Sequence, residues 1–182
     1  MKTTIYLIRH SIPFKEHMGT KLVNDDLLSW NMKTPLSVKG EKLSCEYFSK
    51  DEFRKVDVVF SSSYVRAMAT AKYLAYQNDL LINVNSCFDE RIHGINDWSE
   101  LPKNFELRQF IDPEYKIGNG ESRLEVMERM LNGLDKILEE YRGKNIAMLL
   151  LLPFFLIRKV LLDLKEFGIF HERFLHEYHD FD

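Results

Sequence analysis

The sequence predicts an α/β fold of three layers, in which helices cover both faces of a largely parallel central sheet. Two observations support this class. Short apolar runs typical of buried strands alternate along the chain with longer segments of helical periodicity. The strongest strand candidates are also almost continuously apolar, as parallel strands buried on both faces are. Because 182 residues suffice for one domain with a sizeable core, we treat residues 1–182 as a single domain, in which 155–182 carry no clear structural signal.

Each expected element has a local signal. Runs of apolar and β-branched residues predict four strands. Ser37 is a typical N-cap for the first predicted helix. The capping-box spacing that begins at Ser122, with Gly143 beyond the far end, marks the last one. The strands are expected at Thr3–Ile8, Val56–Phe60, Leu80–Val84 and Ile146–Leu152, and the helices directly after Ser37, at Tyr64–Tyr76 and at Arg123–Tyr141.

Two polar segments are predicted to be long loops. Pro13–Lys33 contains several turn residues, and Asp97–Asn119 is polar and aromatic. Long loops carried by a rigid scaffold often cover or form binding sites. We therefore expect these two segments to determine which substrate is bound.

The overall composition excludes several classes of partner. A formal charge of −3 gives no general attraction to nucleic acid or to anionic membranes. The longest apolar run, Ile146–Ile157, is shorter than the roughly 20 residues of a membrane helix, and it contains Pro153. No secretory signal is apparent, so we expect a cytoplasmic protein in which Cys45 and Cys87 are buried or half-buried free thiols.

Charged and hydroxyl side chains follow two of the predicted strands. Arg9 and His10 end the first strand, while Ser62 and Arg66 follow the second, at a strand-to-helix turn. In parallel sheets, ligands bind beyond the carboxyl ends of the strands. An arginine can hold an anion, an imidazole can attack it, and a helix start offers free N–H groups. The pattern favours a phosphate site; the alternatives are a surface Arg-His pair and a plain serine N-cap with a solvated arginine.

Several stretches, in the same order, resemble motifs of the histidine phosphatase superfamily, the group that includes cofactor-dependent phosphoglycerate mutases. Each motif is modest alone, but their order and spacing together are hard to produce by accident. The resemblance covers about residues 3–146. The similar stretches are the strand motif Leu7–Ser11, the helix start Pro35–Gly40, the arginine motif Ser61–Ala71, the acid motif Glu90–Gly94 and the stretch Gly120–Ser122.

The resemblance implies a phosphoglycerate mutase-like fold and a phosphoryl-transfer mechanism. His10 would attack a phosphomonoester and form a transient phosphohistidine. Arg9 and Arg66 would neutralise the phosphoryl oxygens, so that no metal or other cofactor is needed. Glu90 would protonate the leaving oxygen and later act as the base towards water.

The substrate is less sharply defined by the sequence. Ser62 is a candidate for substrate binding. Arg91 would either meet a substrate carboxylate or pair with Asp89, and His93 is either a pocket residue or a hydrogen-bonded loop residue. The resemblance implies a small phosphorylated metabolite or a phosphoprotein as substrate. A mutase is less favoured, because mutases of this group carry long insertions for which the chain looks too short.

The last predicted strand departs from the family pattern. The family places a second histidine after this strand, whereas this chain has leucines, with Leu151 at about the position of that histidine. Leucine has neither a donor nor a charge, and losing a preorganised donor commonly costs roughly 3–4 kcal/mol of transition-state stabilisation. The spacing of the tail histidines suggests no obvious replacement; they are His171, His176 and His179.

Three hypotheses for function remain at this point. The protein is a phosphatase, weakened or not; or a pseudo-enzyme that binds a phosphate-bearing ligand or a partner without turnover; or a protein that shares only the fold. The abrupt change after Ala147 also suggests a frameshift in the coding segment. Finding Ser-His-Gly in another frame of the resequenced gene would support the frameshift, and a clean frame with the same leucines would contradict it.

Overall fold

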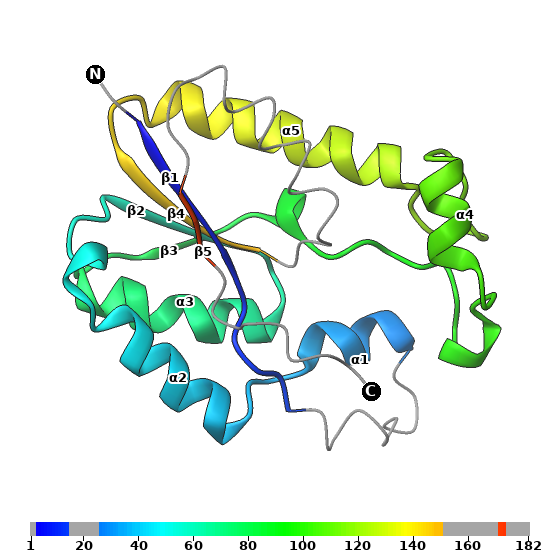
Figure 1. The fold of residues 1–182 in the computed structure, drawn as a ribbon, viewed down its shortest axis with the longest axis horizontal. Helices are drawn as coiled ribbons and strands as arrows, with labels where there is room; N and C mark the ends of the chain where they lie inside the picture. The colour runs from blue at the N-terminus through cyan, green and yellow to red at the C-terminus, as the bar shows by residue number, and fades with distance from the viewer. Residues whose placement is uncertain (1–2, 15–25, 151–170, 174–182) are drawn as a thin grey trace.

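The computed structural model describes residues 3–14, 26–150 and 171–173. Its centre is a five-stranded sheet in the order β3-β2-β4-β1-β5, in which every strand pair is parallel (Figure 1). The predicted α/β class is therefore confirmed. The strands are β1 (Thr4–Arg9), β2 (Val58–Ser61), β3 (Ile82–Val84), β4 (Asn145–Leu150) and β5 (His171–Arg173).

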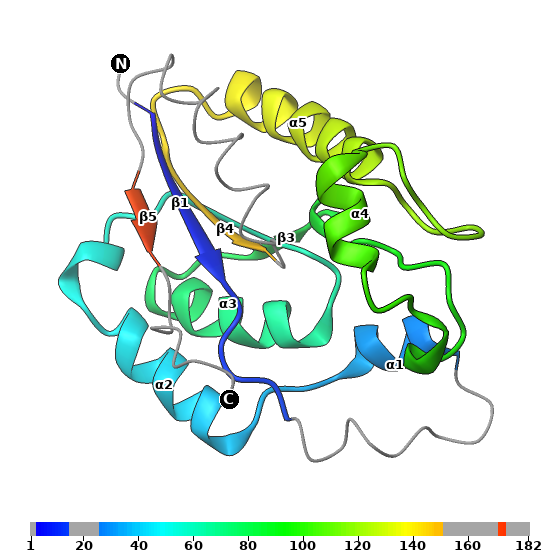
Figure 2. The same cartoon turned by 45° about the vertical axis from the view of Figure 1, so that its right-hand side comes forward.

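Helices cover both faces of the sheet, as Figures 1 and 2 show from two directions. Helix α5 (Arg123–Glu140) lies on one face, and helices α2 (Val38–Phe48) and α3 (Val65–Gln77) lie on the other. The result is the three-layer arrangement that the alternation of strands and helices predicts.

Side chains of the central strand β4 alternate between two hydrophobic cores. Ile146, Met148 and Leu150 pack in the core beneath α5, whereas Ala147 and Leu149 pack in the core formed with α2 and α3. All five are almost completely buried. This burial on both faces explains why the strand reads as a continuous apolar run and not as an alternating one.

The predicted helix starts are confirmed. The Ser37 hydroxyl accepts a hydrogen bond from the Gly40 N–H (3.0 Å) at the start of α2. At the start of α5, Ser122 and Glu125 form the reciprocal capping box. Beyond α5, Gly143 adopts a positive φ of 78°, the left-handed conformation that glycine tolerates best.

Both segments that were predicted to be loops contain a helix. Within Pro13–Lys33, helix α1 (Leu27–Lys33) begins at Asp26, whose carboxylate accepts a hydrogen bond from the Ser29 N–H (2.7 Å). Within Asp97–Asn119, the structure has helix α4 (Phe105–Ile111). Figure 1 shows α1 and α4 on the side of the sheet towards which β1 and β4 run.

Strand β5 was not predicted from the sequence. It contains His171, for which no strand was predicted, and it pairs with β1 through residues 171–173. Residues Leu151 and Leu152 of the last predicted strand, like His176 and His179, lie outside the described residues.

The two cysteines differ in their exposure. Cys87 is half-buried, as predicted, but Cys45 is exposed, because it lies on the outer side of α2. None of the helices in the described ranges has the length and apolarity of a membrane span.

Candidate active site

His10 lies immediately beyond the carboxyl end of β1, with only 8% of its surface exposed. Its Nδ1 is 2.7 Å from the carbonyl oxygen of Ser11. Because a carbonyl oxygen only accepts hydrogen bonds, this contact assigns the proton to Nδ1 and leaves a lone pair on Nε2. Nε2 is therefore the ring atom that can act as a nucleophile.

The chain next to His10 is fixed by both helices on that face of the sheet. The Ser11 N–H donates to the Thr70 hydroxyl of α3 (3.0 Å), and the Ser11 hydroxyl donates to the Gly40 carbonyl of α2 (2.9 Å). A Cβ atom on Gly40 would lie 2.3 Å from the Ile12 carbonyl oxygen, so only glycine permits this close approach. These contacts hold the imidazole on a rigid base.

Arg66, in the first turn of α3, points towards His10. Its side chain is only 6% exposed, and its Nε lies 3.4 Å from Nε2 of His10. The two Nη atoms donate to the Asn31 carbonyl (2.6 Å) and to the Glu90 carboxylate (2.8 Å). One guanidinium thus joins α1, α3 and the loop that carries Glu90.

The electrostatic surroundings of Arg66 are those of a partly desolvated cation. Burial lowers the pKa of Arg66 from its ordinary value, although the carboxylate of Glu90 opposes this shift. The charge of Arg9, which ends β1, lowers the Arg66 pKa further. The positive charge of Arg9 is therefore felt at Arg66, and an arginine retains its charge under such a shift. A dianionic phosphoryl group would relieve their repulsion.

Glu90 is half-buried beside Arg66, which also contacts His10. Its Oε2 accepts hydrogen bonds from Arg66 and from the side-chain amide of Asn31 (2.9 Å). Burial raises the pKa of the neighbouring Tyr64, and the charge of Glu90 raises it further. The structure therefore brings His10, Arg66 and Glu90 together, and adds Asn31, which sequence reasoning missed because it lies in a segment predicted to be a loop.

The turn after β2 differs from the prediction in one respect. Its N–H groups were expected to be free for a phosphate, but the Ser62 N–H donates to the Leu149 carbonyl (3.0 Å) and the Ser63 N–H donates to the Asp89 carboxylate (2.7 Å). The N-cap of α3 is Tyr64 and not a serine. Ser62 itself is fully buried, and among the described residues its hydroxyl has no hydrogen-bond partner.

Arg91 points away from the Arg66 cluster. It is buried, and it donates hydrogen bonds to the side chains of Gln109 and Glu106 (2.6 Å). One of its Nη atoms also lies 3.2 Å from Nε2 of His93. The predicted alternative of a pair with Asp89 is wrong, because both carboxylate oxygens of Asp89 bind Ser63 instead.

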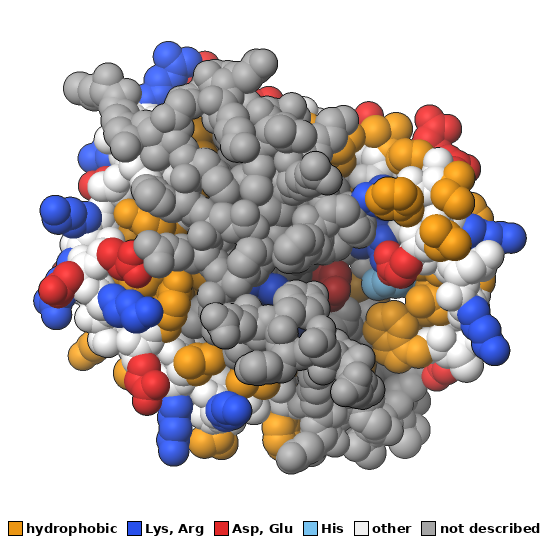
Figure 3. Space-filling view, viewed as in Figure 1, with side chains coloured by type: hydrophobic (Ala, Val, Ile, Leu, Met, Phe, Trp, Pro, Cys, Tyr) orange, Lys and Arg blue, Asp and Glu red, His pale blue; other side chains and the backbone are white. Residues whose placement is uncertain are grey.

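A cavity of about 470 Å³ lies next to this cluster, between α1 and the segments around α4. It shares Asn31 with the Arg66–Glu90 contact, and it is also bounded by Arg91, His93 and Trp98. On the α4 side of the molecule, Figure 3 shows hydrophobic side chains around a histidine, interspersed with acidic groups. Within the described ranges, no group of three or more His, Cys, Asp or Glu side chains is placed to hold a metal ion.

The pKa of His93 provides a testable pH dependence of stability. Burial lowers this pKa from its ordinary value of 6.5, and the charge of Arg91 lowers it further. As the pH falls below the pKa that His93 has in the unfolded chain, the unfolded chain takes up a proton that the folded protein does not bind. The free energy of unfolding should therefore decrease as the pH is lowered from about 7.5 to about 5.5. Urea unfolding of the wild type and of His93→Gln at both pH values should show a smaller decrease in the variant; equal decreases would contradict this role of His93.

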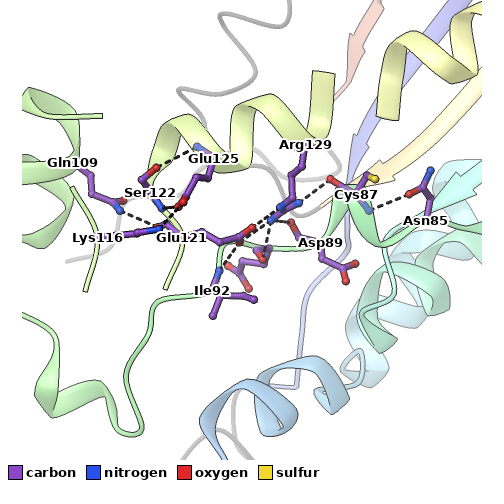
Figure 4. Close-up of polar contacts among 11 residues, drawn as sticks. Asn85, Cys87, Asp89, Ile92, Gln109, Lys116, Glu121, Ser122, Glu125 and Arg129 are labelled. Atoms are coloured by element: carbon purple, nitrogen blue, oxygen red, sulfur yellow. Dashed lines mark hydrogen bonds and ion pairs between the residues drawn. The ribbon is translucent and has the colours of Figure 1, made fainter. Parts of the chain in front are cut away.

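Arg129 is a second residue that sequence reasoning missed. It lies on α5 and bonds to the carboxylate of Glu121 and to backbone carbonyls of the loop that precedes Ile92 (Figure 4). The only signal was its position seven residues after Ser122, about two helical turns beyond the Gly120–Ser122 stretch. Helical periodicity is recognised from apolar residues, so it does not single out a charged residue such as Arg129.

Several solved structures have a similar fold, and some of them are named as phosphatases. The solved structures include YhfR from Bacillus stearothermophilus, with 16% identity, coverage of 91% of this chain and 81% of that one, and a TM-score of 0.68. Mycobacterial glucosyl-3-phosphoglycerate phosphatase has 18% identity, coverage of 88% and 78%, and a TM-score of 0.65. Alpha-ribazole phosphatase from Shigella flexneri has 19% identity, coverage of 91% and 80%, and a TM-score of 0.62.

At these identities the structural likeness establishes the fold alone. No curated protein matches the sequence. A sequence profile of the histidine phosphatase superfamily (branch 1), however, matches residues 5–152, which include His10, Arg66 and Glu90. The match covers most of the chain and agrees with the fold. The protein therefore belongs to the histidine phosphatase superfamily.

Proposed function

We propose that the protein is a phosphomonoester hydrolase that acts through a phosphohistidine on His10. The observation that supports this most directly is the position of the Arg66 guanidinium, which contacts Nε2 of His10 at 3.4 Å and the carboxylate of Glu90 at 2.8 Å. A nucleophile, a cation and a carboxyl group within one hydrogen-bonded cluster are the groups that phosphoryl transfer to histidine requires.

In the first step, the lone pair on Nε2 of His10 attacks the phosphorus atom in line with the ester oxygen. The N–P bond forms as the P–O bond to the leaving group breaks, and Glu90 in its acid form gives its proton to that oxygen. Arg66 and Arg9 offset the charge on the three remaining phosphoryl oxygens. The hydrogen bond from Nδ1 to Ser11 offsets the positive charge that the ring acquires.

In the second step, a water molecule attacks the phosphohistidine. Glu90, now a carboxylate, takes a proton from the water, the N–P bond breaks, and inorganic phosphate leaves while His10 regains its lone pair. Apart from the water, every group that moves a proton or an electron pair in this cycle is a side chain of the described cluster, His10 or Glu90.

The cavity beside Asn31 supports a small phosphorylated metabolite over a phosphoprotein. A volume of about 470 Å³ lies within the usual range for small-molecule pockets. The solved structures named as glucosyl-3-phosphoglycerate and alpha-ribazole phosphatases favour the same class. In this proposal the leaving group enters the cavity near Arg91, the Ser62 hydroxyl is a further ligand of the phosphoryl group, and the protein acts in the cytoplasm without nucleic-acid or membrane partners.

Glu90→Gln gives a specific test of the general acid. Glutamine keeps a side-chain oxygen that can accept from Arg66 and Asn31, but it has no acidic proton to transfer to the leaving oxygen. We expect kcat/KM for an alkyl phosphate to fall by roughly 10²–10⁴-fold, because its leaving oxygen needs a proton, with a much smaller effect on kcat/KM for p-nitrophenyl phosphate. We compare kcat/KM because it reports only the steps up to phosphorylation of His10, whereas kcat also includes the later hydrolysis in which Glu90 acts as base. Steady-state kinetics with the wild type and the variant on both esters measure the two losses. Equal losses for the alkyl phosphate and for p-nitrophenyl phosphate would exclude Glu90 as the acid.

The second candidate is a pseudo-enzyme of the same fold, and the leucines around Leu151 favour it. A panel of phosphomonoesters, combined with an acid-labile assay for phosphohistidine, separates the two candidates. Turnover and labelling of the wild type would support the hydrolase. Binding of phosphate or vanadate without turnover would support the pseudo-enzyme, and absence of both would leave only the shared fold.

A further inference from the structure

The ion pair between Arg129 and Glu121 connects helix α5 to the acid loop, which we define as residues 87–92. We infer that these two side chains are positioning residues for Glu90. This role rests on the proposed function of Glu90 as general acid. Among the described residues, neither side chain has a hydrogen bond or ion pair to His10 or Arg66, so the contacts that connect them to the chemistry run through the loop.

The ion pair has two parallel hydrogen bonds. Nε of Arg129 donates to Oε1 of Glu121 at 2.6 Å, and Nη2 donates to Oε2 at 2.9 Å. The two side chains are only 23% and 19% exposed, so solvent screens the pair weakly. Such a fork-to-carboxylate contact fixes direction as well as distance, and a lysine cannot reproduce it.

The remaining donors of Arg129 bind the backbone of the acid loop. Nη1 donates to the carbonyl of Cys87 (2.7 Å), and Nη2 donates to the carbonyls of Asp89 (3.0 Å) and Glu90 (3.3 Å). Figure 4 shows the guanidinium lying between Glu121 and this stretch of loop. The backbone of the proposed acid itself is therefore held by Arg129.

Glu121 holds the far end of the same loop. Its Oε2 accepts a hydrogen bond from the Ile92 N–H (2.9 Å), and its own N–H donates to the Ile92 carbonyl (2.7 Å). Glu121 directly precedes Ser122, the capped start of α5, so the contact is anchored to a helix that is packed against the sheet. The backbone is thus fixed on both sides of the Glu90 side chain.

The side chains of the loop point in the opposite direction, towards the site. Asp89 accepts from the N–H (2.7 Å) and the hydroxyl (2.6 Å) of Ser63, while Glu90 accepts from Arg66. A shift of the loop would therefore move the acid and loosen the turn before α3 together. Displacement by about 1 Å can cost on the order of 10²-fold in rate.

The variants that test this are Arg129→Lys and Glu121→Gln. Both retain polar side chains of similar size, but each breaks the fork. We expect kcat/KM for an alkyl phosphate to fall by roughly 10- to 100-fold and kcat/KM for p-nitrophenyl phosphate to fall only a few-fold, since phosphorylation by that ester does not need the acid. In a Glu90→Gln background, Arg129→Lys should add almost nothing. Arg54→Lys is the matched control, because Arg54 is exposed and pairs with Asp51 outside the site.

Equal losses on the two esters in a folded variant would overturn the inference, because a merely structural role slows both. Thermal unfolding of each variant checks that it is folded. Amide hydrogen exchange gives a readout independent of turnover: protection of the Ser63 and Ile92 amides should fall in Arg129→Lys and not in Arg54→Lys. If the wild type hydrolyses neither ester, the proposed function fails, and unchanged exchange at Ser63 would then overturn the positioning role on its own.

Discussion

Replacing His10 with alanine is expected to abolish both hydrolysis and phosphohistidine labelling. The variant removes Nε2, the imidazole nitrogen that lies 3.4 Å from Nε of Arg66 and would form the N–P bond, and in the proposed mechanism Glu90 transfers protons and does not attack phosphorus. Loss of a covalent nucleophile typically lowers kcat on the order of 10⁴-fold or more. Kinetics on the best ester of the panel, with acid-labile labelling in parallel, measure the loss.

Two controls make the His10 result specific. Thermal unfolding should show that His10→Ala remains folded, because the backbone at Ser11 is held by α2 and α3 independently of the imidazole. Added imidazole should restore part of the activity by entering the space that the side chain leaves. Turnover in His10→Ala comparable to the wild type would show that hydrolysis proceeds without this nucleophile.

Replacing Arg66 with lysine should produce the second-largest loss. Lysine keeps the positive charge, but one ammonium group cannot contact His10, Asn31 and Glu90 at once as the guanidinium does. We expect kcat/KM to fall by roughly 10²–10³-fold, with weaker binding of vanadate. Titration with vanadate and steady-state kinetics measure the two effects.

Arg54→Lys serves as the control for Arg66 as well, because it makes the same change at an exposed arginine with one ionic partner. It should leave kcat/KM and vanadate binding unchanged. An Arg66→Lys enzyme with wild-type kinetics would mean that this charge is not aimed at the phosphoryl group, and the proposed roles of Arg66 and Glu90 would both have to be abandoned.

The strands and the capped helices were predictable because their signals are local. Strand β2 is apolar from Val58 to Phe60 and β4 from Ile146 to Leu150, and the capping box at Ser122 requires only four consecutive residues. Helix α1 has seven residues and a mixed face, so its only local signal is the Asp26 cap, which also fits a turn. The three residues of β5 give no signal either, because an edge strand this short is defined by its pairing with β1.

Sequence reasoning located the candidate site only in part. His10, Arg66 and Glu90 were identified, and the structure brings them into one cluster. Asn31 was missed because its contacts with Arg66 and Glu90 depend on where α1 packs. Arg129 was missed because a charged residue on an amphipathic helix normally faces solvent, and only the tertiary structure reveals that it points at the acid loop.

The place of β4 in the sheet has a consequence for the order of folding. Strand β1 leads to His10, and strand β2 leads to Arg66. These two strands do not pair with each other, because β4 lies between them and pairs with both. While the chain is being synthesised, nearly all the residues of the proposed chemistry emerge well before Asn145. The pocket can assemble only after the loop of some 140 residues between β1 and β4 has closed, a long-range contact that forms slowly. A strand without a proposed catalytic side chain thus determines when the nascent protein first acquires its site.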